Sequence, residues 1–300
     1  MDELTHKLAH KKAFPLHLQR RAVFGTARRL PTVPIMVLGT LAFVALLANF
    51  IAPYSPNAVS LHNTLSPPFW AEGGSATNLL GTDNLGRDIL SRIIWGARVS
   101  VTVSLIAIVL GAIVGTALGL FSGYVGGKVD LIIMRAADAT MSFPMIMFAL
   151  LLAVALGPRF TNVVIVIALV LWARFARMVR GEALSLKERD FVARAKVSGC
   201  SSWRIMGRHI LPNLLNTVVV LATLQVGWAI LLEASLSFLG AGIPPTTPSW
   251  GLMVAEGRKY IMIAWWLPLF PGLAITLTVL SINLFGDWLR DALDPKLRQV

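Results

Sequence analysis

Long apolar runs alternate with charged segments along this chain, and the alternation constrains its fold more than any other feature. About 20 apolar residues suffice to cross a membrane as a helix, whereas a charge in hydrocarbon costs about 2.5–3.5 kcal/mol. Charged residues make up only 14% of the 300 residues and apolar residues 56%. Soluble domains carry about 25% charged residues. The pattern therefore predicts an all-α polytopic membrane protein.

The charge pattern also divides the chain into segments. We expect a basic tail at 1–32, a first transmembrane helix at 32–53, an outer segment at 54–97, a transmembrane core at 98–286 and a second tail at 287–300. Five further spans are expected within the core, at about 99–124, 130–156, 160–173, 214–239 and 267–285. Because Lys and Arg concentrate in the tails and at 174–208, the positive-inside rule predicts six spans with both termini in the cytoplasm.

The basic excess does not indicate nucleic-acid binding. The formal net charge is +12, but the basic residues gather at the ends of apolar spans, where they would anchor the chain to membrane lipids. His6 and His10 have helical metal-ligand spacing but no further ligands, so we expect no metal site. Lys128 follows two glycines without the rest of a Walker motif, so we expect no ATP hydrolysis and no enzymatic activity in this chain.

Several local patterns refine the spans. Glycines recur every fourth residue in the second span and predict close contact with another helix of the same chain; they are Gly111, Gly115, Gly119 and Gly123. Pro144 predicts a kink in the third span, and Arg135 is spaced to pair with Asp138. Before the second span, a glycine-punctuated turn is followed by apolar residues from Ile89 to Ile94, which predict a short interfacial helix.

The polar, basic segment 186–213 lies between two apolar spans and must stand in water. It is typical of two short helices joined at Gly199, which supplies the left-handed backbone that ends the first. Asp190 is expected to cap the first helix, and Pro212 to end the second. The segment therefore predicts a docking hairpin with an apolar ridge and basic flanks.

The hairpin resembles the cytoplasmic "EAA" loop in the inner-membrane subunits of binding-protein-dependent ABC importers. Glycine and Leu-Pro keep the spacing of that motif, at Gly199 and at Leu211-Pro212, while Ala193 stands where the motif has glutamate. Other stretches are similar to the dipeptide, oligopeptide and nickel permease subfamily; they are SPPFW at 66–70, GTDNLGRD at 81–88, EASLSFLG at 233–240 and the C-terminal GDWLRDALDPKLRQ at 286–299.

This resemblance implies a MetI-like type I permease subunit, located in the bacterial inner (plasma) membrane, for dipeptides or related small peptides. It further implies a homologous permease partner, two cytoplasmic subunits that bind ATP and Mg²⁺, and an extracytoplasmic substrate-binding protein. No cofactor is expected in this chain. The residues expected to couple it to the ATPase subunits are Asp190, Phe191, Val192, Ala193, Arg194, Ala195, Gly199, Leu211 and Pro212.

Two polar residues of the fifth span, Gln225 and Glu233, are candidates for the translocation path. For Glu233, structural pairing and substrate contact are equally favoured. Nickel, oligopeptides and glutathione remain alternative substrates. The rival from another class is a proton-coupled secondary transporter with Glu233 as its titrating group, although two equivalent halves with interrupted helices are not evident in the sequence.

Overall fold

The computed structural model describes residues 30–293, and the regular elements in this range are helices. The basic residues of the N-terminal tail, the His6/His10 pair and the end of the C-terminal tail lie outside the described residues. The principal helices are α2 (Thr32–Leu46), α3 (Ala48–Ile51), α4 (Ile89–Val125), α5 (Gly127–Ser142), α6 (Met145–Leu156), α7 (Phe160–Lys187), α8 (Asp190–Val197), α9 (Ser202–Arg204), the π-helix η2 (Ile205–Ile210), α10 (Leu211–Phe238), α11 (Trp250–Gly257) and α12 (Trp266–Leu293). Two single 3₁₀ turns, η1 (Leu61–Asn63) and η3 (Arg258–Tyr260), lie in loops.

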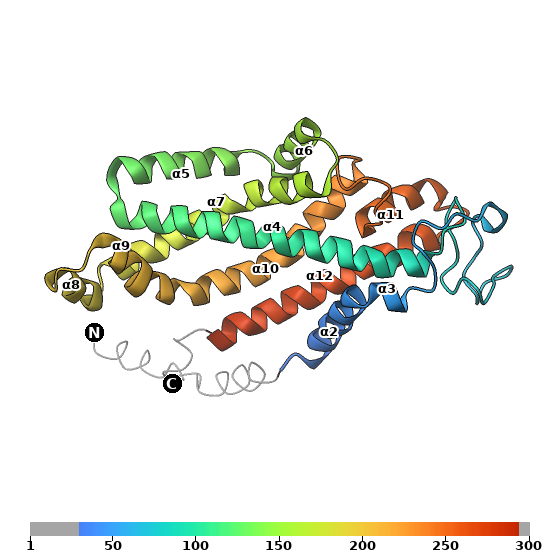
Figure 1. Ribbon diagram of the computed structural model, residues 1–300, viewed down its shortest axis with the longest axis horizontal. Coiled ribbons are helices and arrows are strands. Elements are labelled where there is room, and N and C mark those ends of the chain that lie inside the picture. The colour runs from blue at the N-terminus through green and yellow to red at the C-terminus, as the bar shows by residue number, and fades with distance from the viewer. Residues whose placement is uncertain (1–29, 294–300) are drawn as a thin grey trace, which may run out of the picture.

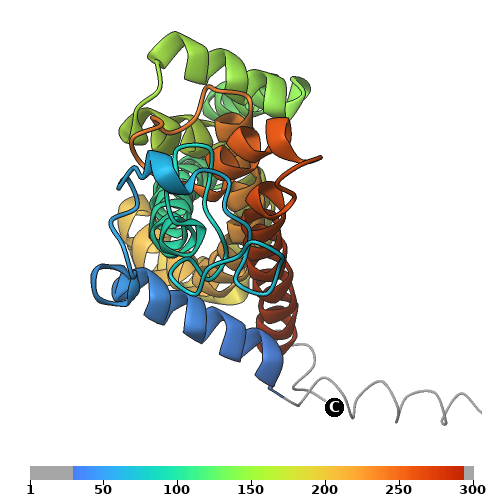
Figure 2. The ribbon, with the colours of Figure 1, turned by 90° about the vertical axis from the view of Figure 1, so that its right-hand side faces the viewer.

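The long helices α4, α7, α10 and α12 run lengthwise through the molecule (Figure 1). Helices α5 and α6 lie over α7, whereas α2 lies against α12 and α4 on another side (Figure 2). The short helices α8 and α9 occupy one end, and α11 with the loops of residues 52–88 occupies the other (Figure 1). The two ends are therefore joined by helices that span the length of the fold.

Four helical stretches of the described chain are long and apolar enough to cross a membrane, and the bent pair α5–α6 would make a fifth. Helix α2 is shorter, with 15 residues, and Leu47 separates it from α3. The prediction of an all-helical membrane protein is confirmed. The number of spans that the helices establish is four or five.

The expected interfacial helix and second span form one continuous helix, α4, of 37 residues. The prediction of a separate interfacial helix was therefore wrong. Asp88 caps α4, since its Oδ2 accepts hydrogen bonds from the backbone N–H and the hydroxyl of Ser91 at 2.8 and 2.7 Å. Because the helix starts ten residues before the predicted span, it extends beyond the apolar run toward the loops of residues 52–88.

The glycine stripe of α4 packs directly on the backbone of α7, as the spacing predicts. A Cβ atom at Gly115 or Gly119 would lie 2.4 Å from a carbonyl oxygen of Trp172 or Ala176. Gly111 and Gly123 face Ala168 and Arg180 in the same way, so every fourth residue of each helix takes part. Only glycine lets the two backbones approach this closely.

We expect Gly119→Ala to destabilise the protein by about 1–3 kcal/mol, because the added methyl group would meet the α7 backbone, which cannot rotate away. Gly181→Ala in α7 is the matched control, since a Cβ there meets no atom within 4 Å and alanine favours helix by up to about 1 kcal/mol. Thermal unfolding of the detergent-purified protein measures both. Equal unfolding temperatures for the two variants would contradict the close-packing explanation.

The third predicted span is broken at Pro144 rather than gently kinked. Helices α5 and α6 meet at an angle of 96°, with Phe143 and Pro144 in extended conformations between them. Asp138 pairs with Arg177 of α7 and not, as predicted, with Arg135. The positive charge that neutralises Asp138 therefore comes from α7, whereas the sequence spacing had predicted that it would come from α5 itself.

The GTDNLGRD stretch forms a buried ionic cluster between the outer loop, α4 and α11. Asp83 accepts hydrogen bonds from the backbone N–H and Nε of Arg87, at 2.9 and 2.6 Å, and from Arg92. Glu256 of α11 approaches the same two guanidinium groups at 3.1 and 3.0 Å. The glycines shape the turn: Gly86 has φ +71°, and a Cβ there would lie 1.9 Å from the Ser60 carbonyl oxygen.

Candidate functional site: the hairpin at 186–213 and the polar groups of the helix bundle

The segment 186–213 forms the predicted hairpin, and its backbone is shaped at Gly199. Helix α8 ends at Val197, and Gly199 has φ +76°, in the left-handed region that glycine adopts without strain. The predicted cap was wrong: Arg189 occupies the N-cap position without a side-chain hydrogen bond, and Asp190 is the first residue of the helix. There the carboxylate of Asp190 complements the helix dipole instead.

The second arm of the hairpin does not stop at Pro212. It runs from α9 through the π-helix η2 directly into α10, so that Pro212 lies in the first turn of α10. The prediction of a helix end at this proline was wrong because the wider π turn accommodates a residue that cannot donate a backbone hydrogen bond. The hairpin is consequently continuous with a membrane-length helix.

One face of the hairpin seats it on α4 and α7. Val192 and Ala195 of α8 are buried with Ile205, Met206 and Ile210 of the return arm. The helices beneath contribute further buried apolar residues to the same cluster, namely Leu120, Val179, Ala183 and Leu214. Burial of this face fixes the orientation of the hairpin relative to the bundle.

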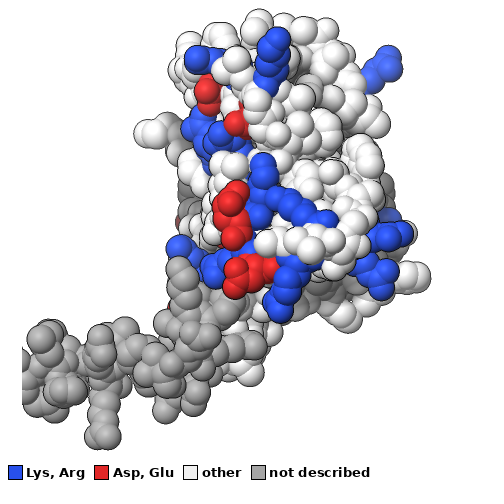
Figure 3. Space-filling model, turned by 90° about the vertical axis from the view of Figure 1, so that its left-hand side faces the viewer, with Lys and Arg blue, Asp and Glu red and all other residues white. Residues whose placement is uncertain are grey.

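The opposite face of the hairpin is open. Among the residues predicted to dock, Asp190, Ala193, Arg194 and Gly199 are exposed and Phe191 is half-buried. Val197 is 90% exposed, and Trp203 is 74% exposed and stacks on Phe121. The sequence prediction omitted Val197, although it lies four residues after Ala193 on the same face. Viewed from this end, the surface is mostly uncharged, and its basic side chains outnumber its acidic ones (Figure 3).

Polar contacts join the helices next to the hairpin. Arg180 of α7 donates from Nε and from a terminal nitrogen to the two carboxylate oxygens of Asp130 in α5, at 2.5 and 2.6 Å. Such a two-point pair holds its partners in a defined orientation. Lys187 donates to the carbonyl oxygen of Tyr124 at 2.8 Å, which links the end of α7 to α4. These contacts link α7, from which the hairpin emerges, to α5 and α4.

The two polar candidates of α10 have different surroundings. Glu233 is fully buried and accepts hydrogen bonds from Ser100 of α4 at 2.9 Å and Ser237 at 2.8 Å. Gln225 is also buried; its Oε1 accepts from Arg174 of α7 at 3.4 Å, and its Nε2 has no hydrogen-bond partner. Glu233 therefore joins two helices in this conformation, whereas Gln225 retains an unused donor.

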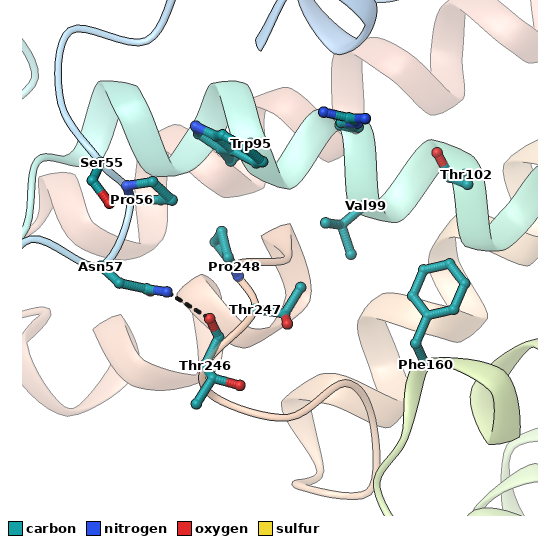
Figure 4. A pocket seen from close by; sticks show the side chains of 11 residues that line it. Ser55, Pro56, Asn57, Trp95, Val99, Thr102, Phe160, Thr246, Thr247 and Pro248 are labelled. Atoms are coloured by element: carbon teal, nitrogen blue, oxygen red, sulfur yellow. Dashed lines mark hydrogen bonds between the residues drawn. The ribbon is translucent and has the colours of Figure 1, made fainter. Parts of the chain in front are cut away.

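A cavity of about 460 Å³ lies at the other end of the bundle (Figure 4). Its lining comes from the loop after α3, the first turns of α4, the start of α7 and the loop before α11. Asn57 donates to the carbonyl oxygen of Thr246 at 2.8 Å and closes one side. Trp95 and Arg98 of α4 provide an aromatic and a cationic group beside it.

These features can be compared with known proteins. Residues 115–299, which include the hairpin, match the family described as the binding-protein-dependent transport system inner membrane component. The chain belongs to this family. As an inner membrane component it is a transport permease subunit rather than an enzyme, and its long apolar helices lie in the inner membrane.

Curated relatives extend the match over most of this permease. It is 44% identical over 298 residues to a putative peptide transport system permease protein of Brucella suis, covering 97% of this chain and 98% of the relative. It is 44% identical to the di/tripeptide transport system permease protein DppC of Pseudomonas aeruginosa, with 86% and 85% covered. The glutathione transport system permease protein GsiD of Pectobacterium atrosepticum is 42% identical, with 85% and 83% covered.

A solved structure of the methionine ABC transporter MetNI in inward-facing conformations resembles the permease with a TM-score of 0.55. The match covers 68% of this chain and 96% of the other chain, at 17% identity. The similarity establishes a MetI-like fold for the region that it covers.

Proposed function

We propose that this chain is one permease subunit of an ATP-driven importer for dipeptides and related small peptides. The observation that carries the proposal is the near-complete match to peptide permeases. It is supported by a hairpin whose open face exposes Val197 and Trp203 beside charged side chains. A homologous permease would complete the pore, two cytoplasmic subunits would bind ATP and Mg²⁺, and an extracytoplasmic binding protein would deliver substrate.

The open face of the hairpin is the proposed contact with an ATPase subunit. Asp190, Phe191, Ala193 and Arg194 would enter a groove of that subunit, with Val197 at the tip. The opposite face of the hairpin would hold it on the bundle through Val192, Ala195 and Leu211. When ATP draws the two ATPase subunits together, the Arg180–Asp130 pair and the continuous α9–α10 helix would carry the displacement to the pore.

The proposed topology has six spans with both termini in the cytoplasm. It counts α2 with α3 as the first span, the bent α5–α6 pair as the third, and residues 54–97 as extracytoplasmic. In this topology the cavity beside Trp95 and Arg98 faces the side where a binding protein would dock. Gln225 would lie on the translocation path, and Glu233 would stabilise the contact between α4 and α10 beside it.

Uptake by the complete complex in proteoliposomes tests the substrate class. We expect radiolabelled dipeptides and tripeptides to accumulate with ATP, and unlabelled dipeptide to compete far better than glutathione, a longer oligopeptide or nickel. The binding protein does most of the selecting, so its ligand affinities are measured in parallel. Accumulation of nickel or glutathione without any dipeptide uptake would overturn the peptide assignment and leave the family membership intact.

A further inference from the structure

Three arginines follow one another at three-residue intervals along α7, and two of them are neutralised. Arg177 pairs with Asp138 and Arg180 pairs with Asp130, both from α5. Within residues 30–293 no carboxylate pairs with Arg174. Arg174 directly follows the apolar run of the fourth span, so it lies at the end of that span. A half-buried arginine at this position that meets no carboxylate of the described chain is a candidate for binding an anion.

Arg174 is surrounded by neutral groups. Its guanidinium lies 3.4 Å from Oε1 of Gln225, 3.6 Å from Sδ of Met145 and 5.5 Å from the ring centre of Trp228. The aromatic face stabilises the cation without using up its hydrogen-bond donors. Arg174 lies about 21 Å along α7 from Phe160, at 1.5 Å per residue, and therefore at the cytoplasmic end of the proposed fourth span.

The surroundings of Arg174 are open on one side. It is half-buried, and Trp228 is 49% exposed. An apolar cavity of about 360 Å³ begins one turn further along α10, at Leu231, and next to Met145 on α6, at Ile146. It continues along α10 to Phe238 and is bounded by α11 and α12. An apolar trough therefore lies next to a guanidinium that meets no carboxylate within residues 30–293 and to the amide nitrogen of Gln225, which has no hydrogen-bond partner in that range.

We propose that Arg174 binds the C-terminal carboxylate of the transported peptide during passage, with Gln225 as a second donor and the α6–α10 trough receiving apolar side chains. The proposal rests on the peptide-importer function and names the chemical group that the pore recognises. A guanidinium offers parallel N–H donors that match a carboxylate, and the peptide terminus carries this charge at neutral pH. The missing counter-charge would thus be supplied only while substrate is bound.

The test uses the complete complex in proteoliposomes with alanylphenylalanine as the probe. Arg174→Gln is compared with Arg177→Gln. Arg177 lies three residues further along α7 and belongs to an exposed ion pair, so this control removes the same charge from a neighbouring position. We expect R174Q to lower peptide uptake per ATP hydrolysed by about tenfold, the size of one lost charge-assisted hydrogen-bonded contact. R177Q should retain wild-type uptake, because exposed pairs contribute little. R174K should recover most of the loss.

A second arm identifies the recognised group. The C-terminal amide of the same dipeptide is supplied at concentrations that saturate the binding protein, and its uptake should differ little between wild type and R174Q. If R174Q lowers uptake of the dipeptide and of its C-terminal amide by the same factor, Arg174 does not recognise the carboxylate and the proposal is overturned. A different result for R174Q would be a lower yield of assembled complex with normal uptake per complex. This result would show that Arg174 contacts the partner permease rather than the peptide, and it would also overturn the proposal.

Failure of wild type to transport any dipeptide would instead contradict the proposed peptide function, so the two failures are distinguishable. Should R174Q not assemble, Trp228→Leu keeps the charge and removes the ring beside it. We expect this variant to reduce uptake of the acid per ATP by about threefold, within the range of a cation–π contact. If W228L takes up as much of the acid per ATP hydrolysed as wild type does, the result would count against a peptide-binding site at Arg174.

Discussion

Asp83→Ala should destabilise the protein by about 3–5 kcal/mol, the usual cost of removing one partner from a buried ionic cluster. Asp83 is 2% exposed, and Arg92, one of its two arginine partners, is 1% exposed. The substitution leaves both guanidinium groups with only Glu256, which is partly exposed. It also removes the acceptor of the Leu85 and Arg87 backbone N–H groups.

Thermal unfolding of the purified protein measures this loss, and limited proteolysis of residues 54–88 reports whether the outer loop has opened. Asp138→Ala is the matched control, because Asp138 also pairs with an arginine but both side chains are about half exposed. We expect the control to cost at most about 1 kcal/mol. If both alanine variants unfold at the same temperature, the outer cluster does not hold the loop to the bundle.

Gly199→Val should abolish most peptide uptake while leaving insertion and subunit assembly intact. Gly199 has φ +76°, and a Cβ there meets no atom within 4 Å, so the effect arises from the backbone rather than from a clash. A left-handed conformation costs an L-residue about 1–2 kcal/mol, and more for a β-branched one. The hairpin would relax to another turn and present α8 at a different angle.

Uptake should fall by tenfold or more, since a small misplacement of a coupling element prevents productive movement. Basal ATP hydrolysis by the complex should persist. Gly199→Asn is the control, because asparagine tolerates left-handed backbone, and we expect it to keep most of the uptake. Normal uptake by the valine variant would argue that the hairpin does not transmit motion from the ATPase subunits.

Much of the fold was predictable because its signals are local. Apolar runs longer than a membrane is thick, a glycine every fourth residue and a glycine after a short polar helix each depend on neighbours within a few turns. These signals correctly predicted the helical membrane fold, the contact between α4 and α7, and the left-handed turn at Gly199. The family followed from motifs of the same kind.

The errors arose where the structure around a local pattern changed its outcome. Asp138 is spaced to pair with Arg135 but lies closer to Arg177, 39 residues away. Pro212 is a helix breaker by its chemistry, yet the π turn before it lets the helix continue. The helix starting at Ile89 was predicted to be a separate helix lying at the membrane interface, but it continues into the second span as α4.

The amino-acid order alone was sufficient to predict that the chain enters a membrane and that it turns at Gly199, since hydrophobicity and backbone freedom belong to each residue and its neighbours. Folding in three dimensions was needed to show which charges are neutralised. Arg87 and Arg92 meet Glu256 across more than 160 residues, whereas Arg174 meets no carboxylate within the described chain. Pairing energy depends on distance and burial, and neither quantity is encoded in sequence spacing.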